Sequence, residues 1–424
     1  MRVRVLVPTV VAALLASVSP VAPAVAAPRI SAVVSTDPVD WTPHIRDGAV
    51  WAMAVVGDTV VVGGDFGAVA PAGSRRSLAR RNLMAFRLSD GAVTSFSPDV
   101  NGVVTAIAAA PDGSVIIGGD FTGVNGYQRR SLARLDVATG GVWRDFQPRV
   151  DGDVRAVAVR GSSLYIGGRF TGVSGVARQG MARLNAHDGA VDTSFDADLT
   201  PAVGDQPTVE SIALSPDGNR LVAVGNFAAA QGQPRAQLVM IDVAGSATVA
   251  DWHTPFYETS CHPQFDTYLR DVDFSPDGRY LVAVTTGHDT GPDLPCNTTA
   301  RFEAVGTGTR GPTWVNHTGG HSLYAVAATG SAVYVGGHQL WLDNPDGQKV
   351  AGPGAVERPG IGAIDPMTGR ALEWNPTRTR GVGVRAFAVC PLGLLVGSDT
   401  DELGNEYHGR IGMFPDPAFR GSDR

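Results

Sequence analysis

The sequence predicts an all-β protein, a seven-bladed β-propeller with four-stranded blades, whose ring is closed by an N-terminal strand that completes the last blade. Three observations predict this fold. A glycine-terminated strand recurs seven times, each repeat unit contains four short strands, and one aromatic strand is displaced to the N-terminus. The repeat recurs at steps of 49 to 61 residues, which indicates a ring or an array rather than seven separate domains.

The composition is that of a globular chain with many turns. Of 424 residues, 43% are apolar and 18% are charged, while 53 glycines and 28 prolines stay below the share typical of low-complexity sequence. The net charge is −7 and no Lys/Arg-rich block occurs, so nucleic acid is not an expected partner.

The N-terminus predicts export. Arg2 and Arg4 precede an apolar run over residues 5–18, and Ala24-Val25-Ala26 fits a signal-peptidase site, so residues 1–26 are predicted to be a signal peptide. The alternative is a membrane anchor, but this run is too short to span a bilayer. We therefore expect a secreted or envelope protein without a membrane span and in monomeric form, with the propeller over 27–418 and a disordered tail at 419–424.

The glycine-terminated strand is the clearest repeat. Four copies consist of an apolar run, a glycine and an aromatic residue, and three later copies are weaker. The strong copies lie at 60–66, 115–121, 164–170 and 221–227, and the weaker ones at 281–287, 333–339 and 394–399.

Each unit is predicted to contain four strands. A small-residue strand such as 104–109 leads, often through a Pro-Asp-Gly turn, into the glycine-terminated strand, as expected of a hairpin. After a longer loop comes a third strand such as 132–136, and a fourth such as 142–146 carries an aromatic residue. The fourth-strand aromatics are Phe96, Phe146, Phe195, Trp252, Trp314 and Trp374.

The seventh fourth-strand aromatic is missing from the C-terminus and is found near the N-terminus. The last unit ends at Met413-Phe414, whereas Trp41 lies in a segment, 39–43, that is similar to the other fourth strands. We therefore predict that residues 38–45 pair with residues 410–414. Closing the ring in this way removes the exposed sheet edges. An open solenoid, in contrast, would have no use for a displaced strand.

The repeat resembles a known family. Gly-Gly-Asp-Phe at the strand end, Leu-Ala-Arg-Leu-Asp in the third strand and Phe-x-Pro in the fourth are similar to the delta-sixty repeat β-propellers of secreted bacterial proteins. Residues 51–200 carry the resemblance best, and residues 270–409 look like the second half of an actinobacterial branch. The resemblance implies a fold and a location but no general enzymatic activity. Kelch propellers are the nearest alternative, because they also place paired glycines after the second strand.

Two sets of polar residues are candidates on the face that carries the longer loops, 66–80, 286–301, 337–359 and 397–409. The position after the glycine pair predicts a polar ring, with capping of strand ends as the alternative. Its members are Asp65, Asp120, Arg169, Asn226, Thr286, His338 and Asp399. A ligand site is predicted beside it, because His, Trp, Arg and Asp together can stack on a sugar ring and bond its hydroxyls. Its members are His338, Gln339, Trp341, Arg378, Arg380, Asp399 and Asp401, and the alternative for Trp341 is packing between blades.

No cofactor and no zinc-type spacing of ligands is predicted. Six of nine histidines lie between 253 and 338, but scattered loop histidines explain them as well as a metal site does. Asp399 and Asp401 lie in an oxygen-rich segment that could bind Ca²⁺, with a solvated acidic loop as the alternative.

Two functions follow from these features. The first is a binding or scaffold module for a protein or glycan on the long-loop face, because a fold alone implies no reaction. The second is a hydrolase or lyase acting on polysaccharide, with acids such as Asp399 and Asp401 and the base His338. Asp boxes, adjacent cysteines and a Gly-x-Ser-x-Gly elbow are absent from the sequence, which favours binding.

The three cysteines predict one disulfide in an oxidising compartment. Cys261 and Cys296 lie in loops expected on the same face, so we predict that they pair. Cys390 ends a first strand on the opposite face and is predicted to be a free, buried thiol.

Overall fold

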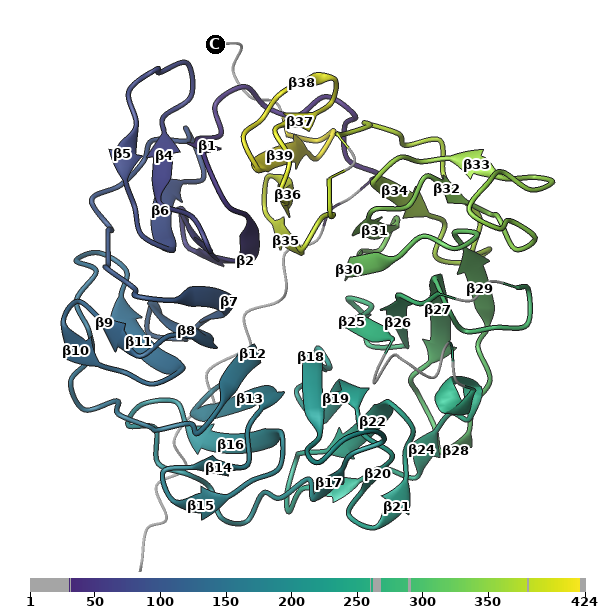
Figure 1. The fold of residues 1–424 in the computed structure, drawn as a ribbon, viewed down its shortest axis with the longest axis horizontal. Helices are drawn as coiled ribbons and strands as arrows, with labels where there is room; N and C mark the ends of the chain where they lie inside the picture. Colours follow the sequence, from purple (N-terminus) through teal and green to yellow (C-terminus); the bar gives the residue numbers. More distant parts are fainter. Residues whose placement is uncertain are drawn as a thin grey trace, which may run out of the picture.

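The computed structural model describes residues 30, 32–259, 261, 268–288, 291–379 and 381–419. Its strands form sheets that are arranged around a central axis (Figure 1), and the only helical element of these residues is the 3-10 helix η1 (Phe256–Glu258). The predicted signal peptide at 1–26, residues 420–424 of the predicted tail, and Arg380 lie outside the described residues. No helix in the described ranges is long and apolar enough to cross a membrane.

Seven sheets of the described chain each contain one glycine-terminated strand, and these are called the main sheets. The first three consist of β2 (Val50–Val56), β3 (Thr59–Gly64) and β6 (Leu83–Arg87); of β7 (Val103–Ala109), β8 (Ser114–Asp120) and β11 (Leu132–Asp136); and of β12 (Asp153–Arg160), β13 (Ser163–Arg169) and β16 (Met181–Asn185). The fourth and fifth consist of β18 (Thr208–Leu214), β19 (Arg220–Asn226), β22 (Leu238–Asp242) and β23 (Thr248–Val249), and of β25 (Leu269–Phe274), β26 (Tyr280–Thr285), β27 (Thr298–Glu303) and β29 (Trp314–His317). The last two consist of β30 (Leu323–Ala328), β31 (Val333–Gly337) and β34 (Ile361–Ile364), and of β35 (Ala386–Cys390), β36 (Gly393–Gly397) and β39 (Ile411–Pro415).

The loops between second and third strands carry small hairpins in six main sheets, and two of these hairpins gain a third short strand; one further small sheet of the described chain is a parallel pair. They lie towards the rim of the molecule in Figure 1, outside the main sheets. Their strands are β1 (His44–Ile45), β4 (Ala68–Ala70), β5 (Leu78–Ala79), β9 (Gly123–Val124), β10 (Tyr127–Gln128), β14 (Gly172–Val173), β15 (Val176–Ala177), β17 (Leu199–Thr200), β20 (Ala229–Ala230), β21 (Gln233–Pro234), β24 (Trp252–His253), β28 (Gly308–Thr309), β32 (Trp341–Leu342), β33 (Val356–Glu357), β37 (Glu402–Leu403) and β38 (Glu406–Tyr407).

The first strand of each main sheet is the innermost one and contacts the first strand of the next main sheet. This holds from β2 through β7, β12, β18, β25 and β30 to β35, and β35 in turn contacts β2. The first glycine of the repeat permits this close approach. A methyl group on Gly63 would come within 2.6 Å of Val104 Cγ1 in the neighbouring strand, and one on Gly397 within 2.5 Å of Val50 Cγ1. The first and last main sheets therefore pack as other neighbouring sheets do.

The hydrophobic cores lie between neighbouring sheets. One core joins Val50, Met53 and Phe86 of the first main sheet to Leu395 and Met413 of the last. Each such side chain, removed from water, contributes roughly 1.5–3 kcal/mol to the free energy of folding. The cores thus hold adjacent sheets together face to face.

The fourth strands are shorter than the sequence analysis expects. In four main sheets they are reduced to one isolated bridge, of which Leu135–Val142 is an example, and only the fourth and fifth main sheets have a four-stranded ladder. Proline follows the aromatic residue at Pro98, Pro148 and Pro376. Because proline has no amide donor, it cannot donate a ladder hydrogen bond at these positions.

One hydrogen bond between the third and fourth strands nevertheless recurs in every main sheet. An amide of the fourth strand donates to the carbonyl of the third residue of the repeat's third strand. In chain order the pairs are Thr94–Ala85, Trp143–Arg134, Asp192–Arg183, Ala250–Met240, Thr313–Arg301, Leu372–Ala363 and, for the last main sheet, Val39–Met413, with N···O distances of 2.7 to 2.9 Å. In the last main sheet the donor thus comes from the N-terminal segment. Ser35 N also donates to Pro415 O at 2.9 Å and Ile45 N to Gly409 O at 2.8 Å.

An arginine after the small hairpin ties the fourth strand down in most repeats. Arg129 Nη2, for example, donates to Trp143 O at 3.2 Å, and this guanidinium is buried. The equivalent residues are Arg80, Arg178, Arg235 and Arg358, each of which donates to a carbonyl near the fourth strand. His408 takes the position in the last repeat, where its Nδ1 lies 3.3 Å from Thr42 Oγ1 of the N-terminal segment.

Candidate functional site

A β-bulge near the start of each innermost strand presents one side chain to the central axis. In β2 the register shifts between Val50 and Ala52, which leaves Trp51 as the extra residue. A bulge re-aims one side chain out of the regular alternation and is common beside functional sites. The pairing register shifts at the same place in five other inner strands. In the last main sheet, Arg385 N donates to Gly397 O, and Ala386 is paired with the same Gly397, so two residues again face one. The seven bulge residues are Trp51, Thr105, Arg155, Glu210, Arg270, Tyr324 and Arg385.

All seven bulge residues line one cavity of about 770 Å³, called the central cavity here. Carboxyl groups of Asp120, Asp153 and Asp271 also line it, as do apolar side chains such as Val157 and Ile212. Charged and apolar side chains thus share the wall of this cavity, and a cavity in which polar groups converge is the usual candidate for a ligand site.

Two of the cavity arginines are paired with carboxylates. Arg155 Nε lies 2.6 Å from Asp153 Oδ2, and its Nη1 lies 2.7 Å from Glu210 Oε1. Arg270 Nη1 lies 3.5 Å from the same Glu210 oxygen. Burial alone would lower the pKa of Arg155, but the carboxylates of Glu210 and Asp153 raise it above its usual value. These charges are therefore satisfied within the protein.

Arg385 differs from Arg155 and Arg270. Its Cζ lies over the ring of Trp51 at 4.6 Å and over the ring of Tyr324 at 4.3 Å from the centroid. Its guanidinium has no hydrogen bond or ion pair with a described residue. Burial lowers the pKa of Arg385, and the neighbouring Arg270 adds to this, while Asp399 and Asp65 oppose it.

Asp271 and Asp273 on β25 are half-buried carboxyl groups. Asp271 accepts hydrogen bonds from Ser211 Oγ at 2.7 Å and from Val326 N at 2.9 Å, and Asp273 accepts one from Ala328 N at 2.9 Å. Burial raises the pKa of Asp271 to about 6, and burial together with the charge of Asp271 raises that of Asp273 to about 7. Both groups join β25 to β30 of the next sheet.

Several polar-ring residues contact the walls of the central cavity at its loop end, called the mouth. Asp65 Oδ1 accepts hydrogen bonds from Ala49 N at 2.6 Å and from Trp51 Nε1 at 3.3 Å. His338 Nδ1 lies 3.2 Å from the Tyr324 hydroxyl. Trp51 and Tyr324 are the two rings that enclose Arg385, so the polar ring and the cavity wall meet here.

Other polar-ring residues cap loops or are exposed. Asp399 accepts hydrogen bonds from Val382 N at 2.6 Å and Gly383 N at 3.0 Å, and Asn226 exchanges two with the backbone of Val203. The Thr286 hydroxyl contacts that of Ser322, and Asp120 and Arg169 are exposed. The capping alternative therefore describes Asp399 and Asn226.

The structure separates the predicted ligand residues into groups. Arg378 is buried and donates to Gly337 O at 2.8 Å and Thr400 Oγ1 at 2.6 Å, which links the last two main sheets. Trp341 is half-buried on β32, 5.6 Å from the ring of His321, and Gln339 is fully buried. Arg380 is outside the described residues. Of the described members of this set, His338 contacts the Tyr324 ring beside Arg385, while Asp399 and Arg378 are close enough to Arg385 for their charges to act on it.

Asp399 and Asp401 have separate partners. Asp399 binds the two amides described above, and Asp401 Oδ1 accepts from Arg410 Nη1 at 2.6 Å. Among the described residues, no group of three or more His, Cys, Asp and Glu side chains could hold a metal ion. Calcium at Asp399 and Asp401 stays a prediction.

The cysteine prediction is confirmed. Cys261 and Cys296 form a disulfide with Cα atoms 5.6 Å apart, and Cys390 is a free, buried cysteine. Burial raises the pKa of the Cys390 thiol, which disfavours the reactive thiolate.

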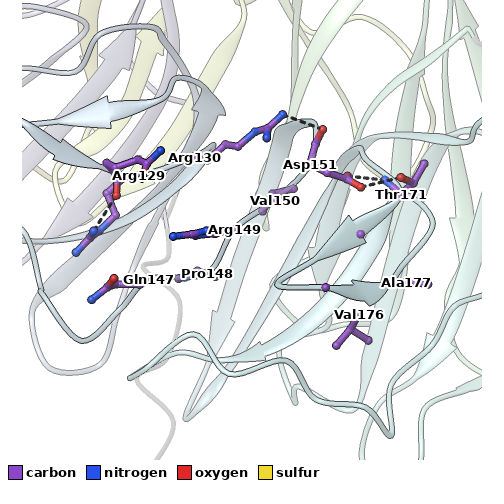
Figure 2. Close-up of a pocket in the computed structure, with 13 residues that line it drawn as sticks. Arg129, Arg130, Gln147, Pro148, Arg149, Val150, Asp151, Thr171, Val176 and Ala177 are labelled. Carbon is purple, nitrogen blue, oxygen red and sulfur yellow. Dashed lines mark hydrogen bonds between the residues drawn. The ribbon is translucent and has the colours of Figure 1, made fainter.

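A second cavity of about 700 Å³ lies between loops of the second and third main sheets (Figure 2). Arg130 and Arg149 line it, but the Asp151 carboxylate is already bonded by Thr171 N at 2.8 Å and by its hydroxyl at 2.7 Å. Arg129 in the same wall is the structural arginine that binds the fourth strand. The central cavity, where the half-buried guanidinium of Arg385 has no hydrogen bond to a described residue, is therefore the stronger candidate.

Comparison with solved structures shows the fold alone. The structure titled "Structure of U3-55K" superposes with a TM-score of 0.54 at 10% identity, and the match covers 89% of this chain and 100% of that one. A designed protein, titled "Crystal structure of the computationally designed Ika8 protein: crystal packing No.1 in P63", gives a TM-score of 0.47 at 15% identity over 88% of this chain and 97% of that one.

The family comparison decides which fold this is. A family model described as "Domain of unknown function (DUF5122) beta-propeller" matches residues 110–137 and 163–195, which span the second to third strands of one main sheet and continue in the next. The chain folds as a β-propeller. No curated protein gives a significant sequence match. A β-propeller domain suggests a binding or scaffold module, although its site must be argued from its own residues.

The sequence predicts a propeller but does not single out its bulge residues. Trp51, Thr105 and Arg155 look like ordinary members of an alternating strand, and their types differ from repeat to repeat. The sequence marks these residues only by their position in the repeat. Each lies about a dozen residues before the glycine pair of its own unit, directly before a small residue such as Ala52 or Ala106.

Proposed function

We propose that this protein is a secreted binding or scaffold module whose ligand, a protein or a glycan, binds at the mouth of the central cavity on the long-loop face. The observation that carries the proposal is the set of seven bulge residues on one cavity. A repeat fold needs no such set for stability, and the seven side chains differ in charge and shape while their positions are equivalent.

The proposal includes a closed ring of seven blades, in which the N-terminal segment completes the last blade. The hydrogen bond from Val39 N to Met413 O supports this, because it is the same bond that joins third and fourth strands in the other main sheets. The core that joins Val50 to Leu395 and the contact of β35 with β2 support it too. A closed ring would hold the seven bulge residues at fixed mutual positions.

Export through a signal peptide at residues 1–26 is also part of the proposal. The Cys261–Cys296 disulfide supports it, because disulfides persist in oxidising compartments. The family resemblance of the repeat to secreted bacterial propellers agrees with this location.

The binding function is tested first on a glycan array, which is probed with the purified chain from residue 27. Glycans that bind, and candidate envelope proteins, are then titrated into the protein. We expect a ligand whose affinity falls at least tenfold in Trp51→Ala, which removes one wall of the mouth. Tyr127→Ala is the matched control, because Tyr127 is an exposed aromatic residue on the small strand β10 and does not line the cavity. Binding that Trp51→Ala leaves intact would contradict a site at the mouth.

A lyase acting on a carboxylated polysaccharide is the second candidate. The contact of Tyr324 with His338 favours it, since a hydroxyl paired with an imidazole beside a cation can move a proton. In such an elimination the C–H bond beside the carboxyl group and the glycosidic C–O bond break, a C=C bond forms, and the departing oxygen gains a proton. Hydrolysis has less support, because Asp399 and Asp401 already have other partners.

Incubation with polyuronates separates these possibilities. An ultraviolet absorbance from unsaturated product that is lost in Tyr324→Phe would establish a lyase. New reducing ends without that absorbance would indicate a hydrolase. Binding with neither product is the result that the binding proposal predicts.

A further inference from the structure

Arg385 is a cation whose hydrogen-bonding capacity is unused in this protein. A guanidinium carries five N–H donors, and buried ones are normally paired. Arg155 and Arg270, at equivalent positions in other sheets, contact carboxylates at 2.6 to 3.5 Å. The guanidinium of Arg385 has no such partner among the described residues, although it lines the same cavity.

The two aromatic rings explain how Arg385 is held without an ion pair. Trp51 and Tyr324 lie 4.6 and 4.3 Å from its Cζ, distances at which cation–π attraction stabilises the charge. Each ring has a further partner: Trp51 Nε1 donates to Asp65, and the Tyr324 hydroxyl contacts His338. The rings therefore hold the guanidinium in place by contact with its charge and use none of its N–H donors.

The nearest carboxylates do not compete for that edge. Asp65 is bonded to Ala49 N and Trp51 Nε1, and Asp399 to Val382 N and Gly383 N. They influence Arg385 only through their charge. An anion that enters the central cavity would therefore meet a preoriented and unpaired arginine.

We propose that Arg385 binds the carboxylate of a uronic acid residue in an acidic glycan, with Trp51 and Tyr324 holding the guanidinium in place. This rests on the proposed binding function and names its ligand class. Arginine binds a carboxylate through two parallel hydrogen bonds, a geometry that lysine cannot reproduce.

The remaining cavity wall favours a sugar acid over other anions. Asp120 offers both carboxylate oxygens, and Asp153 and Glu210 each offer the oxygen that the neighbouring arginines do not contact; such oxygens accept hydrogen bonds from hydroxyl groups. The same carboxylates would repel a phosphate or sulfate group of higher charge more strongly than a single carboxylate. A sugar acid has one carboxylate and several hydroxyl donors on one ring, so each of its groups finds a partner here.

The test begins with the ligand. Oligomers of glucuronate and galacturonate are titrated calorimetrically into the purified chain from residue 27, in parallel with oligomers of glucose and galactose, their carboxyl-reduced counterparts. We expect a uronate oligomer to bind at least tenfold more tightly than its neutral counterpart, and its affinity to fall as salt is added. This comparison needs no variant, so a destabilised mutant cannot obscure it.

Variants then locate the contact. Arg385→Gln removes the charge and should weaken uronate binding tenfold or more, whereas Arg385→Lys keeps the charge without the fork and should give an intermediate loss. Arg279→Gln is the matched control: Arg279 is an exposed arginine in the turn between β25 and β26 and should leave affinity unchanged. Thermal melting of each variant verifies folding.

Three results would overturn the uronate proposal. One is equal binding of uronate and neutral oligomers, in which case the binding function stands without the acid. Another is uronate binding that Arg385→Gln leaves intact. The third is Arg385-dependent binding of a peptide C-terminal carboxylate in the absence of uronate binding, which would assign the same arginine to a protein partner.

Discussion

The amide of Val39 donates a hydrogen bond to the carbonyl of Met413 at 2.9 Å and so joins segments from opposite ends of the chain. The six other main sheets contain the same bond, but there both partners belong to one repeat unit. Within the described residues, the N-terminal segment thus supplies the fourth-strand donor of the last main sheet.

Loss of this bond should destabilise the whole molecule. Val39→Pro removes the amide donor and leaves the Met413 carbonyl unpaired, at a cost of about 1–3 kcal/mol. Urea denaturation followed by circular dichroism measures the change. Thr36→Pro is the control, because Thr36 is exposed in the same segment and its amide makes no hydrogen bond with a described residue. If Val39→Pro unfolded at the same urea concentration as the wild type and Thr36→Pro, the Val39 hydrogen bond would not contribute to the stability of the fold.

A methyl group on Gly397 should disrupt the packing between the last and first main sheets. The added Cβ would approach Val50 Cγ1 to 2.5 Å, so Gly397→Ala should cost about 1–3 kcal/mol through overpacking. Val50→Ala opens space at that point, so the two substitutions should be coupled by about 0.5–3 kcal/mol in a double-mutant cycle. Gly330→Ala, whose Cβ would have no neighbour within 4 Å, should be nearly neutral. Additive costs of the Gly397 and Val50 substitutions would mean that these sheets are not in contact.

Asp271 and Asp273 should make the unfolding free energy fall as pH rises from about 4 to about 7. Their pKa values are raised to about 6 and about 7 in the folded protein, so folding favours their protonated forms. The stability that protonation provides is complete below the unfolded pKa and is lost as pH passes through the folded values.

Asp273→Asn isolates this effect, because the amide oxygen can still accept the hydrogen bond from Ala328 N. Relative to the wild type, the variant should gain about 1–3 kcal/mol at pH 8, a gain that shrinks towards pH 4. Denaturation at both pH values measures the difference. A gain of the same size at both would exclude titration of Asp273 as its cause.

Removal of the disulfide should lower stability, while Cys390 stays unreactive in the native protein. The bond joins residues 35 positions apart, and the chain-entropy relation gives about 3–4 kcal/mol for the Cys261→Ala, Cys296→Ala double variant. Iodoacetamide labelling followed by mass spectrometry should modify no cysteine under native conditions, one after unfolding, and three after unfolding with reduction. Rapid native labelling of Cys390 would contradict its burial.

The repeat positions and the disulfide could be predicted from sequence because each depends on local chemistry. Paired glycines after an apolar run mark where an inner strand of the next sheet must approach closely, and all seven predicted copies are second strands of main sheets. Cys261 and Cys296 could be paired because the loop order in a hairpin repeat determines which face each loop occupies.

The central cavity could not be predicted in the same way. A bulge adds one residue to an otherwise alternating strand, so Trp51 appears in sequence as one more strand residue between Val50 and Ala52. The bulge shifts the alternation by one, and only the pairing register reveals which side chain is displaced. The sequence therefore predicts a ligand site around the loop from His338 to Trp341 and does not single out the bulge residues on the inner strands.

Tryptophan fluorescence with a bound ligand tests most directly whether the site is the central cavity. Trp51 lines the cavity, whereas Trp341 lies on the small strand β32. Ligand binding should change the fluorescence emission of the wild type and of Trp341→Phe, and this change should disappear in Trp51→Phe. Calorimetry on each variant verifies that the ligand still binds. A ligand-induced change that persists in Trp51→Phe and is lost in Trp341→Phe would place the ligand on the outer loops and contradict the account.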